Sequence, residues 1–175
     1  CFSDETSRFL TEEADFVSDE YDDAIIDQIV DYQMGIPKKD RLPICIVLDD
    51  ILGLIKNAST INHLSSRYRH LRATIICVSQ IYKGLPPAMR ANASHSIIFN
   101  NPSEIQLKQL AEGHSQFGGE DNFMALYYEI TREPYAFMLC DHRNMEVWRN
   151  FDEMIWSKND SNYQDTKIDK LNEKT

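Results

Sequence analysis

The sequence predicts an α/β fold with a mostly parallel sheet flanked by helices. Three apolar runs without alternation support this prediction: 44–50 (ICIVLDD), 72–80 (RATIICVSQ) and 93–100 (ASHSIIFN). Runs of this kind are typical of strands buried on both faces, and helix-like stretches separate them, as in a parallel sheet. The runs end in polar residues, so one edge of the sheet is expected to gather Asp49, Asp50, Gln80 and Asn100.

Before the first strand, residues 1–18 are acidic and weakly patterned, which predicts a loop. A helix is predicted over 19–34, because acids crowd its first turn, where the helix dipole favours them, and Gly35 and Pro37 end it. A second helix is predicted over 60–71, with apolar residues on one side and arginines near its end.

After the third run, Ser103 and Gln106 form a capping-box pattern that begins a helix ending at Gly113. Another helix is predicted over 120–130, and its regularly spaced aromatics are assigned to the core rather than to base stacking. Residues 135–140 and 145–149 are predicted to form a strand pair. We expect one domain over 1–156 and a polar, disordered tail over 157–175.

Charge is unevenly distributed along the 175 residues, which carry a formal net charge of −10. Residues 1–35 hold eleven acids and one base, which accounts for −10, so the remainder balances to zero. Residues 36–90 hold nine bases and three acids, a net +6 that is compatible with contact to DNA phosphates, although charge runs are usually solvated surface. No stretch approaches the ~20 apolar residues of a membrane span.

The four cysteines have no C-x-x-C spacing, and Cys45, Cys77 and Cys140 lie in apolar runs, where thiols behave as small hydrophobes. This pattern favours a reducing, intracellular setting over a zinc site. The five histidines are scattered along the sequence, so they indicate no metal centre.

The most informative feature is the first run, which stops at Asp49 and Asp50. Two carboxylates at the end of a buried parallel strand can hold a hydrated Mg²⁺ and orient a water molecule, as at the end of a Walker B strand. The alternative is an ordinary core strand whose aspartates begin a turn.

The order of these segments resembles a known family. A strand ending in Asp49-Asp50 precedes the Arg69-His70 pair, Gln80 ends the next strand, and a Leu-Pro segment then leads to Arg90 and Asn92. Together with the later YAFMLCD and VWRNF, this order resembles the DNA-packaging ATPases of poxviruses and giant viruses, members of the FtsK–HerA superfamily of DNA-pumping motors. The resemblance spans roughly residues 21–151.

The resemblance implies a P-loop NTPase-like fold of the RecA/FtsK type that uses ATP and Mg²⁺. Asp49 would hold the Mg²⁺ shell, largely through water, and Asp50 would position the attacking water. Gln80 would sense the γ-phosphate, since an amide both donates and accepts; its alternative role is a polar strand cap. Arg69 or Arg90 would act in trans as an arginine finger. Asn92 would fix the nucleotide-side loop by hydrogen bonding.

One departure from the family is severe, because no G-x-x-x-x-G-K-[ST] occurs and none of the six glycines precedes a lysine. The phosphate cradle is therefore absent from these residues. We expect the N-terminal P-loop unit to be missing through truncation, with a P-loop-less paralogue as the alternative. Either way, this chain alone is expected to bind ATP poorly.

The leading functional hypothesis is ATP-driven translocation of double-stranded DNA that packages a viral genome, by a hexameric or pentameric ring of identical subunits. Its partners would be DNA and capsid or portal components, in a virion or a cytoplasmic virus factory. A second hypothesis keeps the motor but assigns it to chromosome segregation or conjugation in a bacterial or archaeal cytoplasm. A third is a non-catalytic subunit that joins a ring.

Overall fold

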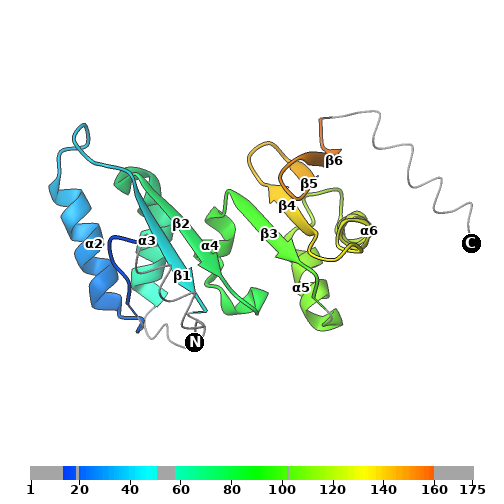
Figure 1. Ribbon diagram of the computed structural model, residues 1–175, viewed down its shortest axis with the longest axis horizontal. Helices are drawn as coiled ribbons and strands as arrows, with labels where there is room; N and C mark the ends of the chain where they lie inside the picture. The colour runs from blue at the N-terminus through cyan, green and yellow to red at the C-terminus, as the bar shows by residue number, and fades with distance from the viewer. Residues whose placement is uncertain (1–13, 19, 51–57, 102, 160–175) are drawn as a thin grey trace, which may run out of the picture. The chain divides into compact units, whose positions relative to one another are not determined.

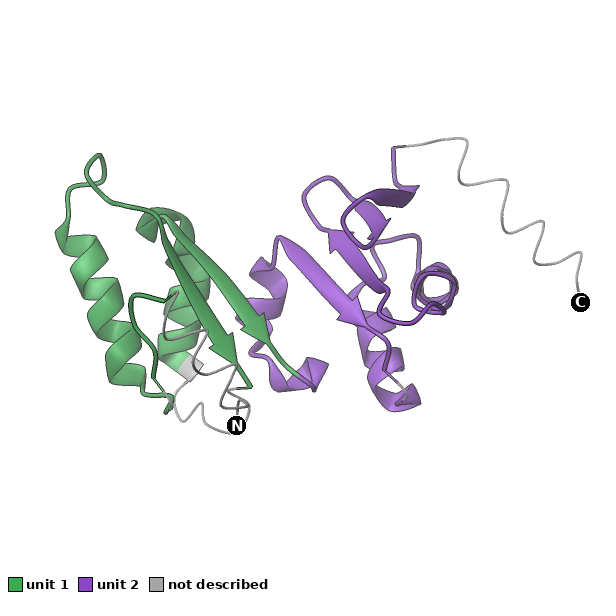
Figure 2. Cartoon of the chain, viewed as in Figure 1, with its two compact units in different colours: residues 1–79 green, residues 80–175 purple. Residues whose placement is uncertain are grey.

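A computed structural model describes residues 14–18, 20–50, 58–101 and 103–159. It contains both helices and strands, so the predicted α/β class is confirmed (Figure 1). The chain divides into two compact units, residues 1–79 and 80–175 (Figure 2), which are treated separately. The predicted domain limits stay a prediction, and residues 1–13 and 160–175 lie outside the described part.

The first unit contains a parallel pair of strands, β1 (Ile44–Asp49) and β2 (Ala73–Val78), joined through α3 (Ala58–Leu71). Helix α2 (Asp23–Gly35) precedes them and packs against α3. The side chain of Asp22 caps α2 by accepting from the N–H of Ala24 at 2.9 Å, which explains why this acid-rich stretch begins a helix there. Both predicted helices and both predicted strands of this unit are confirmed.

Each strand of this pair buries one face only. Ile46 and Leu48 of β1 are buried, as are apolar residues of α2 and α3, including Ile26 and Leu64. On the opposite face, the outward residues of the two strands are exposed: Cys45, Val47 and Asp49 on β1, and Thr74, Ile76 and Val78 on β2. The expectation of burial on both faces is therefore wrong for the described residues, because their helices cover one side of the pair.

The second unit begins with a short helical turn, η1 (Tyr82–Gly84), and α4 (Pro87–Asn92). Four strands follow in the sheet order β3-β4-β5-β6: β3 (His95–Phe99), β4 (Phe137–Asp141), β5 (Glu146–Arg149) and β6 (Glu153–Ser157). All three neighbouring pairs are antiparallel. The predicted hairpin of β4 and β5 is confirmed.

The third strand was expected to lie parallel to the first two, and this expectation is wrong. The 93–100 run forms β3, which pairs antiparallel with β4 rather than joining β1 and β2. The described chain therefore has two parallel and four antiparallel strands, not a mostly parallel sheet. Strand direction depends on the partner, and the partner of β3 lies about forty residues further along the chain.

Two helices, α5 (Glu104–Gly113) and α6 (Glu120–Ile130), supply the rest of the second core. Ser103 caps α5 by accepting from the N–H of Gln106, as predicted. The capping box is not reciprocal, because the side chain of Gln106 accepts from the N–H of Tyr82 at 3.2 Å. No described helix has the length and apolar character needed to cross a membrane.

Candidate functional site

The two aspartates lie where the sequence predicted, at the carboxyl end of β1. Asp49 is in register with Val78 of β2, and the N–H of Asp50 donates to the carbonyl of the same residue at 3.2 Å. Both aspartates are exposed. Two adjacent carboxylates therefore face solvent beside the end of a parallel neighbour, an arrangement suited to hard, hydrated cations such as Mg²⁺.

The backbone turns sharply between these two carboxylates. Asp50 has a φ of 47°, in the left-handed region that most side chains avoid and that aspartate tolerates better than most. A glycine would adopt this conformation with less strain, yet the position carries a carboxylate. The same left-handed conformation occurs at Arg72, Tyr135, Met145 and Asn150, so it does not by itself separate a role in chemistry from a turn at the end of the strand.

The thiol of Cys77 lies within the electrostatic influence of the acid pair. Burial, and then the negative charge of Asp49, raise the pKa of Cys77 to about 11. The thiol therefore stays protonated near neutral pH, and it adds no thiolate nucleophile to this edge.

Gln80 follows the end of β2 by two residues and is exposed. It is the first residue of the second unit, and its sensor role stays a prediction. Asn100 does not belong to this edge. It follows β3 in the other sheet, where its amide donates to the carbonyl of Thr131 at 3.4 Å, so grouping it with the acid pair was wrong.

Arg69 lies at the opposite end of the parallel pair from the aspartates. It is exposed in the last turn of α3, directly before β2 begins. Six strand residues at ~3.3 Å each place the two ends about 20 Å apart. Arg69 therefore cannot reach the acid pair of its own chain, and its role as an arginine finger in trans stays a prediction.

Arg90 and Asn92 are both engaged within their own segment. The Nε of Arg90 donates to the carbonyl of Leu85 at 3.1 Å, and its guanidinium lies 5.1 Å from the ring centre of Tyr82. The amide of Asn92 donates to the carbonyl of Ala88 at 2.8 Å. These contacts stiffen residues 82–92, and nucleotide contacts by either side chain stay a prediction.

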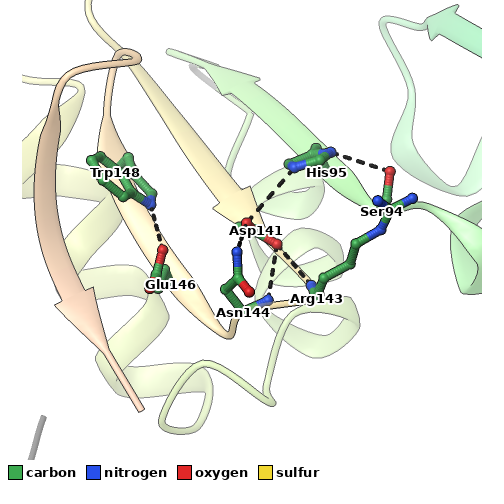
Figure 3. A network of polar contacts seen from close by, with 7 residues as sticks. All are labelled: Ser94, His95, Asp141, Arg143, Asn144, Glu146 and Trp148. Carbon is green, nitrogen blue, oxygen red and sulfur yellow. Dashed lines mark hydrogen bonds and ion pairs between the residues drawn. The ribbon is translucent and has the colours of Figure 1, made fainter. Parts of the chain in front are cut away.

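The second unit contains a polar network that the sequence analysis missed (Figure 3). Asp141, at the end of β4, accepts from the N–H groups of Arg143 and Asn144 at 2.8 and 3.0 Å and from the side-chain amide of Asn144 at 2.8 Å. The Nε2 of His95 lies 3.8 Å from the carboxylate of Asp141, and its Nδ1 lies 3.1 Å from the hydroxyl of Ser94.

This serine, histidine and aspartate do not form a hydrolytic triad. The His95–Asp141 separation exceeds a hydrogen bond, and every short contact of Asp141 serves the hairpin turn. Burial opposes ionisation of Asp141. The hydrogen bonds from Asn144 and Arg143, together with His95, nevertheless hold the pKa of Asp141 below its ordinary value. We interpret Asp141 as the residue that fixes the β4–β5 turn.

Two further histidines meet beside this turn. His142 contacts the hydroxyl of Ser96 at 2.8 Å and the amide of Gln116 at 3.0 Å, and its ring centre lies 5.4 Å from that of His114. The histidines are therefore scattered in sequence but partly assembled in space. Among the described residues, no group of three or more histidines, cysteines or acids is placed to hold a metal ion.

Comparison of the chain with protein-family models, curated proteins and solved structures found no match.

Proposed function

We propose that this chain is the part of an ATP-driven, double-stranded DNA translocase that runs from the Walker B strand to the C-terminal region, and that it packages a viral genome. The observation that carries the proposal is the β1–α3–β2 unit, with Asp49 and Asp50 at the carboxyl end of β1 and a directly parallel neighbour ending beside them. In open α/β sheets this edge is where ligands bind.

The proposed chemistry follows the resemblance given above, and the place of the acid pair at the carboxyl end of β1 supports it. Asp49 helps hold hydrated Mg²⁺, and Asp50, directed by its left-handed backbone, orients the water that attacks the γ-phosphate of ATP. Gln80 senses that phosphate from the end of β2. The cationic group that stabilises the developing charge comes from a neighbouring subunit of a homo-oligomeric ring, through Arg69 or Arg90.

The proposal needs a phosphate-binding loop from outside these 175 residues. β2 has one hydrogen-bonded neighbour among the described strands, so one of its edges is available to a further parallel strand. A strand leading into G-x-x-x-x-G-K-[ST] would supply both the missing neighbour and the cradle of N–H groups. A non-catalytic ring subunit is the alternative, and it requires no such loop.

The test begins with the reading frame upstream of Cys1, where the proposal requires a strand followed by G-x-x-x-x-G-K-[ST]. ATP hydrolysis by the longer protein is then compared with that of its Asp50→Asn variant. We expect turnover to fall at least a hundredfold with ATP binding retained, because a group that orients water acts mainly in the transition state.

Asp40→Asn is the matched control, since it removes an exposed carboxylate four residues before β1 begins at Ile44, at the other end of the strand. It should hydrolyse ATP at the parent rate. A longer protein without a phosphate-binding loop would support the non-catalytic alternative. Parent-like turnover by Asp50→Asn would reduce the acid pair to a strand terminus.

A further inference from the structure

A group of exposed cations surrounds the amino ends of β1 and β2. They come from the loop after α2 and from the end of α3, and we call them the basic edge: Lys38, Lys39, Arg67, Arg69 and Arg72. The exposed acid within these two segments is Asp40. The basic edge lies at the opposite end of the parallel pair from Asp49 and Asp50.

Buried polar side chains hold the two segments together. Arg41 is only 8% exposed, and its guanidinium donates to the carbonyls of Ile36, Met34 and His70 at 2.8, 3.2 and 2.6 Å. The amide of Gln33 donates to the carbonyls of Leu42 and Leu71, both at 2.9 Å. The cations therefore project from a fixed scaffold rather than from independent flexible loops.

Helix capping does not account for these exposed cations. Cations near a helix C-terminus are stabilised by the dipole and by the last carbonyls. In α3, however, the carbonyls of His70 and Leu71 already accept from Arg41 and Gln33. Arg69 instead lies against Tyr68, with its Nε 2.9 Å from the tyrosine oxygen.

Carboxylates do not account for them either. None of the five cations forms an ion pair with an acid in the part of the chain that the structure describes. Arg72 does have a structural contact, since it donates to the carbonyl of Arg41 at 2.7 Å. Among the described residues, Lys38, Lys39, Arg67 and Arg69 therefore carry positive charge that no carboxylate pairs.

We propose that the basic edge binds the phosphate backbone of double-stranded DNA. Charged residues are depleted from the cores of protein interfaces, whereas a surface of Lys and Arg with few carboxylates is the electrostatic footprint of nucleic-acid binding. Arginine also matches phosphate geometry through paired N–H donors. This inference rests on the proposed function and deepens it, because it assigns the contact with DNA to named cations; charge-driven binding requires no ATP hydrolysis, so the two can be tested separately.

Only part of the net charge of −10 lies close enough to oppose this local binding: Asp31, exposed four residues before the end of α2, is about 6 Å from that end at 1.5 Å per residue and offsets some of the charge of the basic edge. Helix α2 has 13 residues, so at 1.5 Å per residue Asp23 at its start lies about 20 Å from its end, where the basic edge begins. That separation exceeds the Debye length of ~10 Å at 0.1 M salt, so the acids at the start of α2 are largely screened from DNA bound at the edge.

The experiment measures binding of the full chain to a labelled 20-base-pair duplex by fluorescence anisotropy, between 50 and 200 mM salt. The logarithm of affinity should fall linearly with the logarithm of salt, by about 0.9 for each phosphate contact. Two double variants test the edge: Lys38→Gln with Lys39→Gln, and Arg67→Gln with Arg69→Gln. Each should make the fall of log affinity with log salt less steep by nearly two. Between 50 and 200 mM salt, each phosphate contact accounts for a roughly threefold loss of affinity. A variant that lacks the contact should not show that part of the loss.

Lys83→Gln with Lys108→Gln is the matched control, because it removes two exposed positive charges from the second unit. It should bind like the parent, and circular dichroism should show all variants folded. No duplex binding by the parent at 50 mM salt would overturn the proposal, as would equal slopes for edge and control variants. A third outcome is that the parent does not bind DNA but associates with itself, and that the edge variants abolish this association. The partner of the basic edge would then be the acidic segment, residues 1–35, of a second copy.

Discussion

The buried imidazole of His114 should make the second unit sensitive to mild acid. His114 is only 1% exposed, and its Nδ1 lies 2.8 Å from the carbonyl of Leu110. The rings of Phe123 and Tyr82 pack at 5.2 and 5.5 Å. Burial, aided by the neighbouring charge of His142 and opposed by the bond to Leu110, lowers the pKa of His114 from 6.5 to about 4.

A pKa lower in the folded state means that protonation favours the unfolded chain. The stabilisation is fully present above pH 6.5 and is lost as the pH falls from 6.5 toward 4, because the unfolded chain binds the proton first in that window. This drop in the pKa of His114 from 6.5 to about 4 corresponds to about 3 kcal/mol of the free energy of unfolding, at 1.36 kcal/mol for each tenfold change in proton affinity.

Tryptophan fluorescence during urea unfolding, measured from pH 4 to 8, is the assay. Both tryptophans, Trp148 and Trp156, belong to the second unit, so their signal reports the unit that contains His114. His114→Asn keeps a donor for Leu110 but cannot titrate, so it should flatten most of the pH dependence. His142, whose pKa is also lowered by burial and by His95, should account for part of the remaining slope.

The pH slope, rather than absolute stability, is compared, because the smaller asparagine leaves a cavity that lowers stability at every pH. His63→Asn serves as the control, since it removes an exposed histidine from the first unit. If His114→Asn keeps the full parental slope between pH 4 and 6.5, the argument from its burial is refuted.

Two other perturbations test the turn and the exposed sheet face. Asp141→Ala removes the acceptor of three hydrogen bonds and should lower the free energy of unfolding of the second unit by about 1–3 kcal/mol in the same assay; unchanged stability would contradict its role in the turn. Val47 and Ile76 are 59% and 47% exposed on the open face of β1 and β2, and an exposed apolar sheet face favours aggregation. The double variant Val47→Thr with Ile76→Thr should therefore raise the protein concentration at which light scattering detects aggregates. An unaltered threshold would show that this face does not drive association.

Local patterns allowed most of the elements to be predicted from the sequence. Asp22 provides the cap of α2, Ser103 caps α5, and the spacing of apolar residues gives α3 and α6. The direction of β3 could not be predicted in the same way. Its sequence, HSIIF, is compatible with either direction, and the pairing of His95 with Asp141 depends on residues 46 positions away.

The same contrast between local patterns and long-range pairing applies to the candidate sites. The acid pair was predictable because one contiguous strand delivers both carboxylates to its end. The network of His95 and Asp141 was not, because the β3–β4 register and the turn bring it together, and no short motif marks it. Local sequence did contain one usable sign, since aspartate followed three residues later by asparagine is a turn pattern.

The placement of charge on β1 and β2 constrains how the proposed motor could be assembled. The carboxylates lie at one end of the strand pair and the basic edge lies at the other, about 20 Å away at ~3.3 Å per residue. A trans role for Arg69 therefore requires that the amino end of one subunit's strand pair meet the carboxyl end of the next. Such a contact joins two different surfaces, which is the head-to-tail geometry that closes into a ring.

An Arg69 placed at that contact is not free to hold DNA at the same time. Two measurements therefore separate the two uses of the Arg69 guanidinium. The salt slope of DNA binding reports its contact with a phosphate of DNA, and the hydrolysis rate of the longer protein reports its role as a finger. If Arg69 supplies a phosphate contact to DNA, Arg90 becomes the favoured candidate for the finger, and it must first leave Leu85 and the ring of Tyr82.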